Sequence, residues 1–288
     1  MQVDYTLLET QGYVVLPGFL NSIELEPFTQ DYRDSIADHY VAYKLRKVSI
    51  NMIDLLCTKI KPSLRAIQNT TNLSVDLIIP LGRYYHNQIS AVDCYHQDHD
   101  SFYILQQYYN YLNFWIPIIK PDANKSGLTI IPWDKLKELT PEYADMIYNY
   151  GATRYFPNGN TTKFVDDNTG KEFVIPCNLD SVAVSPTLNA GDAVILRGDT
   201  IHKTQDHDTD RVAISIRCTD GSALISKNKL FEYGCNDKQN RLSKIQFLLD
   251  RTGEIFETNQ TDTITANEHY ASVIEAYNNN FPSNPLTL

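Results

Sequence analysis

Apolar side chains follow two different periods along the chain, and the change between them falls near residue 75. Residues 22–39 and 50–69 place apolar positions three and four apart, as an amphipathic helix does. Asn21 and Glu24 have the spacing of a capping box, which predicts that the first of these helices starts at residue 22. Just before it, the run GYVVL predicts a short strand that ends at a Pro-Gly pair.

Beyond residue 75 the chain consists of short runs rich in β-branched and aromatic residues, which are typical of strands. These runs are 75–85, 89–96, 108–119, 127–132, 181–186, 192–198 and 211–218. Helices followed by many strands, without regular helices between the strands, argue against a doubly wound parallel sheet. The order favours a mostly antiparallel sandwich or barrel with helices packed outside it.

The remaining segments carry weaker patterns. Residues 133–185 are irregular, and FPNGNTTKF within them predicts a loop or a hairpin excursion. Residues 237–250 and 267–277 have helical spacing, and 278–288 is a polar tail. Because no linker interrupts the chain, we expect one domain over 1–288. Its parts are a helical or mixed segment 1–75, a core of about 76–220 and a mixed extension of about 221–288.

Composition narrows the class of protein. Hydrophobic residues make up 42% of the 288 positions, enough for a sizeable core. The formal net charge of −10 argues against a nucleic-acid-binding surface, because Lys and Arg drive phosphate binding. Five scattered cysteines without a CxxC pair fit a reducing, cytoplasmic setting. We expect no signal peptide and no membrane span, and the sequence gives no sign of the oligomeric state.

The densest group of candidate metal ligands is the segment YHQDHD. His96 and Asp98 are two residues apart, so in an extended segment their side chains lie on the same side. Two histidines and one carboxylate on one face leave other coordination positions open, which is a marker of non-haem iron(II) oxygenases. His202 completes the set, because it follows the strand-like run DAVILRG. Arg211 opens the next strand, and its planar cation is the natural partner for a dicarboxylate.

Several neighbours of these residues have competing interpretations. Alternation places His99 on the face opposite Asp98, so we interpret it as a rim residue, and His207 as a solvated loop residue. Arg217 shares strand parity with Arg211 and is the alternative cation. The preceding strand segment contributes four further candidates for lining the cavity, namely Arg83, Tyr84, Tyr85 and Asn87.

The sequence resembles the phytanoyl-CoA dioxygenase-like branch of the iron(II)/2-oxoglutarate dioxygenases. The resemblance lies in GYVVLPGFLNSIEL, in YHQDHDSF, in NFWIPIIKPDANKSGLTIIP, and in GDAVILRGDTIHKT with DRVAIS. It covers about 10–30 and 80–217, and the last seventy or so residues have no counterpart in the family.

The resemblance implies a double-stranded β-helix (jelly-roll, cupin-like) core with flanking helices. It implies that His96, Asp98 and His202 bind Fe(II), and that Arg211 binds the distal carboxylate of 2-oxoglutarate. Trp115 would lie beside this co-substrate, although a core aromatic is its competing interpretation. Ser215 would add a hydrogen bond to it, at an offset where some relatives have a serine in place of Ala213. The reaction implied is an oxidation by O2, usually a hydroxylation of an unactivated C–H bond with release of succinate and CO2.

The sequence departs from the family in one place. Pro132–Lys135 replaces a Pro-Gly-Ser-His-like turn, so we interpret 133–185 as an insertion that shapes the substrate site. Asp98 is the carboxylate that halogenating relatives lack, which argues against halogenation. We expect a small polar metabolite, a sugar-like group or a natural product as substrate. The alternatives are desaturation or cyclisation at the same site, an acyl-CoA or lipid substrate, a non-catalytic metal-binding β-barrel, and a metal-dependent hydrolase.

Overall fold

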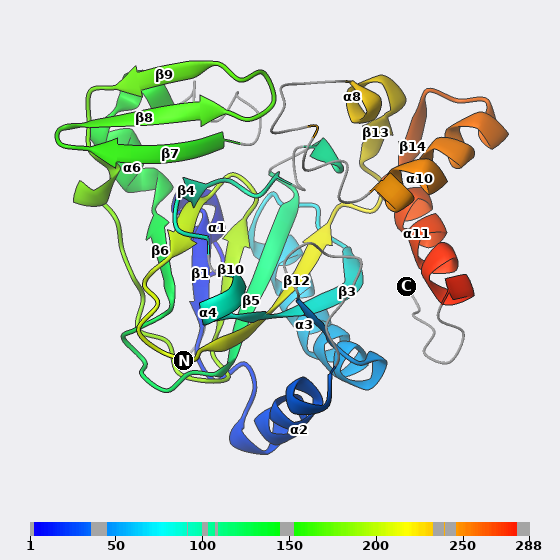
Figure 1. Ribbon diagram of the computed structural model, residues 1–288, viewed down its shortest axis with the longest axis horizontal. Coiled ribbons are helices and arrows are strands. Elements are labelled where there is room, and N and C mark those ends of the chain that lie inside the picture. Colours follow the sequence, from blue (N-terminus) through cyan, green and yellow to red (C-terminus); the bar gives the residue numbers. More distant parts are fainter. Residues whose placement is uncertain are drawn as a thin grey trace.

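The computed structural model describes residues 3–35, 45–90, 92–99, 103–106, 109–144, 153–232, 239 and 246–280. Two six-stranded sheets, antiparallel throughout, form its centre (Figure 1). The first sheet has the order β1 (Tyr13–Leu16), β10 (Ala193–Arg197), β5 (Tyr111–Ile119), β12 (Val212–Thr219), β3 (Leu77–His86), β2 (Arg46–Lys47). The second has the order β6 (Leu128–Ile131), β11 (Ile201–Thr204), β4 (Tyr95–His96), β7 (Thr153–Asn158), β8 (Thr161–Asp166), β9 (Glu172–Ile175).

Successive core strands alternate between these sheets. The chain runs from β3 in the first sheet to β4 in the second, then to β5 and β6, and later from β10 to β11 and back to β12. Such alternation between two facing antiparallel sheets is the path of a double-stranded β-helix. The predicted fold class, mainly β with a jelly-roll core and flanking helices, is therefore confirmed.

Two helices cover the outer face of the first sheet. α2 (Ser22–Asp34) begins at the predicted capping box, and α3 (Ile50–Thr70) follows it. α3 buries residues at helical spacing, namely Ile53, Leu56, Ile60, Leu64 and Ile67. These side chains pack with the even-numbered residues of β5, such as Phe114 and Ile116. Each buried aliphatic side chain contributes about 1.5–3 kcal/mol, so this face supplies much of the stability.

β5 is buried on both faces, which explains its nearly continuous apolar run. Its even-numbered residues meet the helices, so its odd-numbered residues, including Asn113 and Trp115, face the space between the sheets. Trp115 packs there against Leu128 of the second sheet and Ala213 of β12. Polar residues on this inner face therefore lie opposite the strands that carry the candidate metal ligands.

The irregular segment 133–185 contains more regular structure than the sequence indicates. α6 (Trp133–Leu139) opens it, and β7, β8 and β9 extend the second sheet beyond β4 (Figure 1). The expected hairpin is present within FPNGNTTKF, because Asn158 pairs with Thr161 across a two-residue turn in which Gly159 has φ 57°. We call these three strands and the turns between them, residues 153–175, the β7–β9 extension. Residues 145–152 lie outside the described residues.

Two predicted strands are much shorter than expected. In 89–96 only Tyr95 and His96 form a strand, and α4 (Asn87–Ser90) occupies the start of the segment. In 181–186 only Val184 pairs, through an isolated bridge to Ile130, and a short 3-10 turn, Leu179–Ser181, precedes it. Most described residues of these two segments are exposed or half-buried, so their β-branched runs do not belong to core strands.

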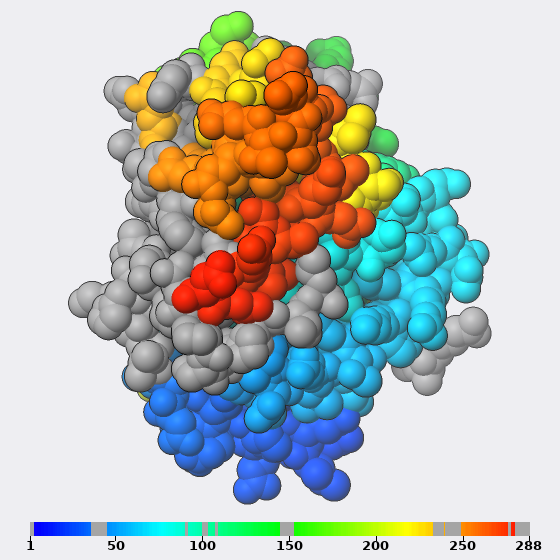
Figure 2. All heavy atoms as spheres, turned by 90° about the vertical axis from the view of Figure 1, so that its right-hand side faces the viewer, coloured from blue at the N-terminus to red at the C-terminus, as the bar shows by residue number. Residues whose placement is uncertain are grey.

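The C-terminal elements form a separate layer on one side of the jelly roll (Figures 1 and 2). They are β13 (Leu224–Ser226), α8 (Lys227–Phe231), α10 (Gln246–Asn259), β14 (Thr263–Thr265) and α11 (Ala266–Asn280). β13 pairs with β14, and their apolar residues pack with Leu77, Ile79 and Tyr111 of the first sheet. The predicted helix 267–277 lies within α11, and α10 covers the last five residues of the predicted helix 237–250. Of the predicted tail 278–288, residues 278–280 belong to α11 and 281–288 lie outside the described residues. Among the described helices, none combines the length and apolarity that crossing a bilayer requires.

The N-terminal α1 (Leu7–Thr10) leads into a close backbone approach at Gly12. Gly12 has φ 82°, and its carbonyl accepts hydrogen bonds from the Arg197 amide at 2.8 Å and the Thr200 hydroxyl at 2.7 Å. A Cβ atom at this position would lie 2.5 Å from Thr200 Oγ1 and 2.6 Å from Trp133 Cδ1. This contact ties the N-terminal segment to the turn that leads into β11.

We predict that Gly12→Ala destabilises the protein more than Gly18→Ala does. Both glycines have positive φ, but a Cβ at Gly18 would meet nothing within 4 Å. Gly18→Ala should therefore cost only the backbone penalty of about 1–2 kcal/mol. Gly12→Ala should cost a further ~1–3 kcal/mol through overpacking, as measured by urea unfolding. Equal losses in the two variants would contradict the close approach.

Candidate metal centre

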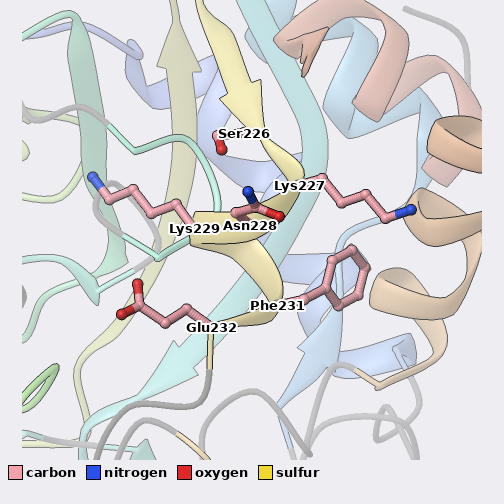
Figure 3. A pocket seen from close by; sticks show the side chains of 6 residues that line it. All are labelled: Ser226, Lys227, Asn228, Lys229, Phe231 and Glu232. Carbon is pink, nitrogen blue, oxygen red and sulfur yellow. The ribbon is translucent and has the colours of Figure 1, made fainter. Parts of the chain in front are cut away.

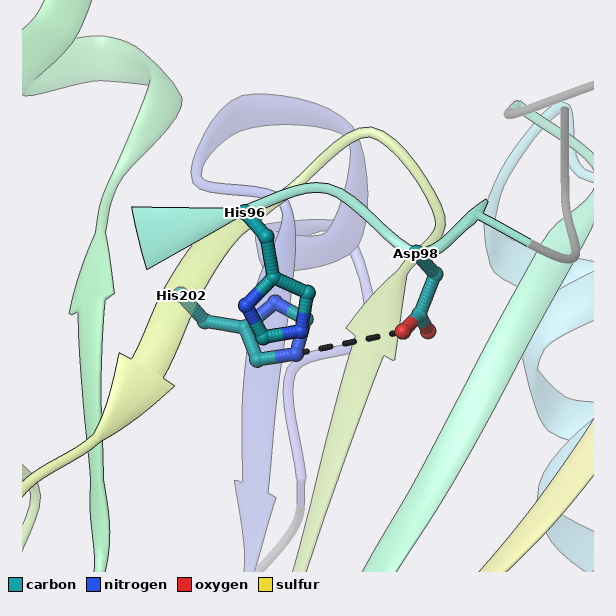
Figure 4. Close-up of side chains that lie close together, drawn as sticks. All are labelled: His96, Asp98 and His202. Atoms are coloured by element: carbon teal, nitrogen blue, oxygen red, sulfur yellow. Dashed lines mark ion pairs between the residues drawn. The ribbon is translucent and has the colours of Figure 1, made fainter. Parts of the chain in front are cut away.

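Three predicted ligands come together at the inner face of the second sheet. His96 ends β4 and His202 lies on the adjacent strand β11, directly opposite it in register. Their ring centroids are 4.5 Å apart, and Asp98 Oδ1 lies 4.0 Å from His202 Nε2. One ligand atom from each of the three residues lies within 4.8 Å of the other two (Figure 4). Asp98 and His202 are buried and His96 is half-buried.

Backbone carbonyls determine which ring nitrogen of each neutral imidazole carries the proton. His96 Nδ1 lies 3.1 Å from the Cys94 carbonyl, and His202 Nδ1 lies 2.9 Å from the Thr200 carbonyl. A carbonyl oxygen only accepts hydrogen bonds, so each Nδ1 carries the proton and donates. The lone pair of each neutral ring is then on Nε2, the nitrogen available to a metal ion.

A short polar chain orients the third ligand. The Asn113 amide donates to Asp98 Oδ2 at 3.3 Å, and the Ser215 hydroxyl donates to Asn113 Oδ1 at 2.5 Å. Asp98 Oδ1, the other carboxylate oxygen, faces the histidines and lies 4.0 Å from His202 Nε2. The Ser215 hydroxyl therefore bonds to Asn113, whereas the family resemblance implied a hydrogen bond to the co-substrate. Asn113 was not among the predicted residues, although a lone amide in the buried run YLNFWIPII is a signal that could have identified it.

The donor set fits a divalent metal ion that keeps open positions. Metal–ligand bonds of about 2.1 Å at right angles place ligand atoms roughly 3 Å apart, so a small side-chain rotation closes the 4.0 Å separation between Asp98 and His202. Two imidazole nitrogens and one carboxylate oxygen are typical of non-haem iron sites. The same set also binds zinc in hydrolases, so the three ligands by themselves do not decide the chemistry.

Arg211 is buried just before β12 and has only neutral hydrogen-bond acceptors. It donates through Nε to the Ser126 carbonyl at 2.9 Å, to the Tyr85 carbonyl at 3.1 Å and to Asn87 Oδ1 at 2.8 Å. Among the described residues, no carboxylate lies within ion-pair distance of its guanidinium. Burial lowers the pKa of Arg211 to about 10, opposed by the more distant charge of Asp206, so it stays charged at neutral pH.

The surroundings of Arg211 favour an anion. Burial, and then the charge of Arg211, lower the pKa of Lys120, which shows that a second cation lies near the first. A buried charge without an oppositely charged partner is costly, and a carboxylate that pairs with it offsets this cost. Asp206 partly offsets both cations and Asp122 partly offsets Lys120, but among the described residues the Arg211 guanidinium makes no ion pair, so its surroundings are a candidate anion site.

A strained turn holds Arg211 in position. Ser126 adopts φ 56°, and its hydroxyl and amide both donate to Asp206 Oδ1 at 2.9 Å. Burial alone would raise the pKa of Asp206, but hydrogen bonds from the amides of Asp208 and Ser126 and from the Ser126 hydroxyl outweigh it and lower that pKa. A non-glycine residue at positive φ costs free energy and is retained where its surroundings hold it. No local pattern predicts this turn, because Ser126 and Asp206 are eighty residues apart in the chain.

Trp115 connects the two ends of the site. Its ring lies 5.2 Å from Arg211 Cζ, within cation–π range, and Asn113, two residues before it on β5, contacts Asp98. Two residues along a strand span about 6.8 Å on the same face. Trp115, beside Arg211, and Asn113, beside Asp98, are therefore successive residues on one face of β5, so the cationic end and the metal end are bordered by the same strand face.

The two other histidines near the site differ in outcome. His207 is exposed and contacts Asp93 Oδ1 at 2.5 Å, as expected for a loop residue. The interpretation of His99 as a rim residue is wrong, because its side chain is 7% exposed and lies 2.7 Å from Asp167 Oδ2. Strand alternation does not apply to it, because β4 ends at His96. Of the other cavity candidates, Tyr84 faces the helices in the outer core, and Arg217 lies opposite Asn113 in the β12–β5 register.

A separate hollow of about 610 Å³ lies beside α8. It is lined by Ser226, Lys227, Asn228, Lys229, Phe231 and Glu232, none of which belongs to the metal centre. Lys227 and Lys229 point in opposite directions (Figure 3). Because the labelled polar groups do not converge on one point, this hollow does not compete with the metal centre as the functional site.

No family model matches this sequence, and no curated protein matches it. Solved structures with a similar fold include the α-ketoglutarate-dependent epimerase SnoN from nogalamycin biosynthesis, at 15% identity and a TM-score of 0.46, covering 76% of this chain and 80% of that chain. HygX from Streptomyces hygroscopicus, with nickel and 2-oxoglutarate bound, has 16% identity, a TM-score of 0.44 and coverage of 74% and 84%. EvdO2 from Micromonospora carbonacea var. aurantiaca, complexed with 2-oxoglutarate, has 13% identity, a TM-score of 0.46 and coverage of 75% and 89%. Likenesses this distant carry no information about the reaction of this chain.

We predict that Ser215→Ala weakens metal binding and leaves 2-oxoglutarate affinity nearly unchanged. Loss of the hydroxyl frees the Asn113 amide that orients Asp98, so the metal Kd should rise several-fold. Asn113→Ala should raise it by about 10–100-fold, the usual effect of removing a residue that orients a ligand. Both values are measurable by metal titration. Thr219→Val, which removes another hydroxyl on β12 bonded to the Asn110 carbonyl, is the matched control and should not change the metal Kd. A selective rise in the 2-oxoglutarate Kd of Ser215→Ala would instead support direct contact with the co-substrate.

Proposed function

We propose that this chain is a mononuclear iron(II) enzyme that uses 2-oxoglutarate and O2 to hydroxylate a C–H bond of a small polar molecule. Succinate and CO2 are the co-products. The observation that carries the proposal is the buried Arg211, which among the described residues bonds to neutral acceptors. It lies beside Trp115, two residues along β5 from the Asn113 that contacts the His-Asp-His site. An open metal site next to a buried anion site is what a chelating dicarboxylate co-substrate requires.

Each residue of the site has a definite task in this proposal. His96, Asp98 and His202 hold the metal ion on one face. When bound, iron(II) supplies the O2-dependent oxidation that is coupled to decarboxylation of 2-oxoglutarate. Asn113 keeps Asp98 turned toward the histidines, and the two backbone carbonyls hold the Nδ1–H tautomer of each neutral ring, in which the lone pair is on Nε2.

Arg211 has the donors that a carboxylate needs. A guanidinium carries five N–H groups, and three of them bind Ser126, Tyr85 and Asn87. One N–H remains on each of the two terminal nitrogens for the distal carboxylate of 2-oxoglutarate. The Trp115 ring beside the guanidinium excludes water, which strengthens the ion pair by lowering the local dielectric.

The substrate side of the metal supports a polar ligand. Arg154 lies directly opposite His96 in the β4–β7 register, so both side chains are on the metal-facing side of the sheet. Its side chain is 27% exposed and pairs with Asp167, so this side of the sheet carries charged groups rather than an apolar surface. A small polar molecule, such as a sugar-like compound or another hydroxylated metabolite, matches this surface better than a lipid chain does.

The competing functions make no use of Arg211. A zinc hydrolase activates water with the same three ligands, and a non-catalytic metal-binding barrel needs only the ligands. Neither accounts for a buried cation beside the site. These functions are therefore separated by whether 2-oxoglutarate binds to the metal-loaded protein.

The first experiment is a titration without oxygen. Purified protein is loaded with Fe(II), and 2-oxoglutarate is added while the visible spectrum is recorded. We expect a weak metal-to-ligand charge-transfer band that needs both components and is lost in His202→Ala. Tight Fe(II) or Zn(II) binding without such a band would remove 2-oxoglutarate from the function and favour the hydrolase or the binding module.

We predict that Arg211→Met raises the Kd for 2-oxoglutarate by about 100-fold or more. Each hydrogen bond to a charged group contributes about 1.5–3 kcal/mol, and two such bonds are lost. The Fe(II) Kd, measured in the same samples, should stay close to the wild-type value and so shows that the site is folded. Arg217→Met, on β12, is the comparison variant, because Arg217 is the alternative cation. If Arg217→Met rather than Arg211→Met weakened 2-oxoglutarate binding, the co-substrate cation would be Arg217.

A further inference from the structure

Gln97, the residue between two of the ligands, is fully buried and makes three side-chain hydrogen bonds. Its amide nitrogen donates to the Asp199 carbonyl at 3.0 Å. Its amide oxygen accepts from the Thr153 hydroxyl at 2.6 Å and from the Tyr155 hydroxyl at 3.1 Å. A buried amide that satisfies both of its ends in this way specifies one arrangement of its neighbours.

The bond to Asp199 joins the two ligand-bearing segments. Asp199 lies three residues before His202. Arg197 donates to the Asp199 carboxylate through Nε at 2.7 Å and through Nη2 at 2.6 Å. The Asp98 amide also donates to the Gly198 carbonyl at 3.3 Å. The Gln97 side chain therefore links the turn that leads to His202 with residues 96–99, which carry His96 and Asp98 and which we call the ligand turn.

The other partners of Gln97 belong to the β7–β9 extension (Figure 1). Thr153 and Tyr155 are the first and third residues of β7, and the backbone N–H of Gln97 donates to the Thr153 carbonyl at 3.1 Å. Between them, Arg154 lies opposite His96 in the sheet. β7 thus contacts the ligand turn through its backbone and through side chains on both faces.

The far end of the ligand turn is held by the same extension. His99 lies 2.7 Å from Asp167 Oδ2, and Arg154 binds Asp167 through Nε at 2.8 Å and through NH2 at 2.7 Å. Asp167 is fully buried and directly follows β8. Of residues 96–99 only His96 belongs to a strand, the two-residue β4, so contacts from β7 and from the residue after β8 replace the longer ladder that would otherwise fix them.

We propose that the β7–β9 extension positions the metal ligands, with Thr153 and Asp167 as its positioning residues and Gln97 as the residue through which Thr153 acts. The inference deepens the proposed function, because it rests on metal binding by His96, Asp98 and His202. Metal affinity depends on holding three side chains in one geometry before the ion arrives. Without the contacts to Gln97 and His99 the ligand turn samples other conformations, and this lost order weakens binding. The segment 133–185 thus acts on the metal site as well as bordering the substrate side.

The test compares two buried threonines of the extension. Thr153→Val removes the hydroxyl that binds Gln97, and Thr162→Val removes one that binds the Cys177 carbonyl at 2.9 Å on neighbouring β8. Both side chains are fully buried, so both variants should lower the Tm of the metal-free protein by similar amounts. We expect Thr153→Val to raise the Kd for Co(II) by about 10-fold or more and to alter the visible spectrum of the bound ion. Thr162→Val should leave the Kd within 2-fold and the spectrum unchanged.

Two further variants keep the test decisive. Thr153→Ser retains the hydroxyl and should restore the wild-type Kd, and Tyr155→Phe removes the weaker contact to Gln97 and serves if Thr153→Val fails to fold. Wild-type affinity in both Thr153→Val and Tyr155→Phe would show that the network is structural only and would overturn the inference. An equal loss of affinity in Thr162→Val would overturn it too. Failure of the wild-type protein to bind Co(II) would instead remove the proposed function, and the inference with it.

Discussion

The site depends on one register, in which His96 of β4 lies directly opposite His202 of β11. Because side chains alternate along a strand, a slip of one residue would turn one imidazole to the far face of the sheet. β4 contains only two residues, so its own ladder holds this register weakly. Three further contacts hold this register: the Gln97 side chain, the backbone N–H of Asp98 and the pairing of β4 with β7. The need for them explains why a polar network is buried beside an apolar core.

The two faces of the first sheet divide stability from function. The outer face packs under α2 and α3 with aliphatic and aromatic side chains, and hydrophobic burial there stabilises the strands. The inner face can then carry Asn113, Ser215 and the nearby Arg211, which are costly to bury. Their hydrogen bonds to one another, to Asp98 and to the Ser126 turn offset that cost and hold each side chain in one orientation.

Patterns along the chain predicted the parts of the fold in which local periodicity and burial agree. α3 buries every third or fourth residue, and β5 and β12 have the apolar runs of strands covered on both faces. The predictions were wrong where a short β-branched run stays outside the core and makes one isolated bridge, as at 181–186. They were incomplete in the β7–β9 extension, whose pairing with β4 joins segments far apart along the chain. His99 was misplaced for a similar reason, because alternation ends where the strand ends.

The sequence by itself determined which residues can bind a metal ion. His96, Asp98 and His202 were identifiable because their types and spacing match a known coordination set, and Arg211 because a cation follows the distal histidine. Only the tertiary structure decided how these residues are oriented. Asn113, Ser126, Gln97 and Asp167 act through contacts between segments far apart in sequence, and no local pattern encodes such contacts. Orientation is a property of packed partners, so it exists only once the two sheets and the extension have come together.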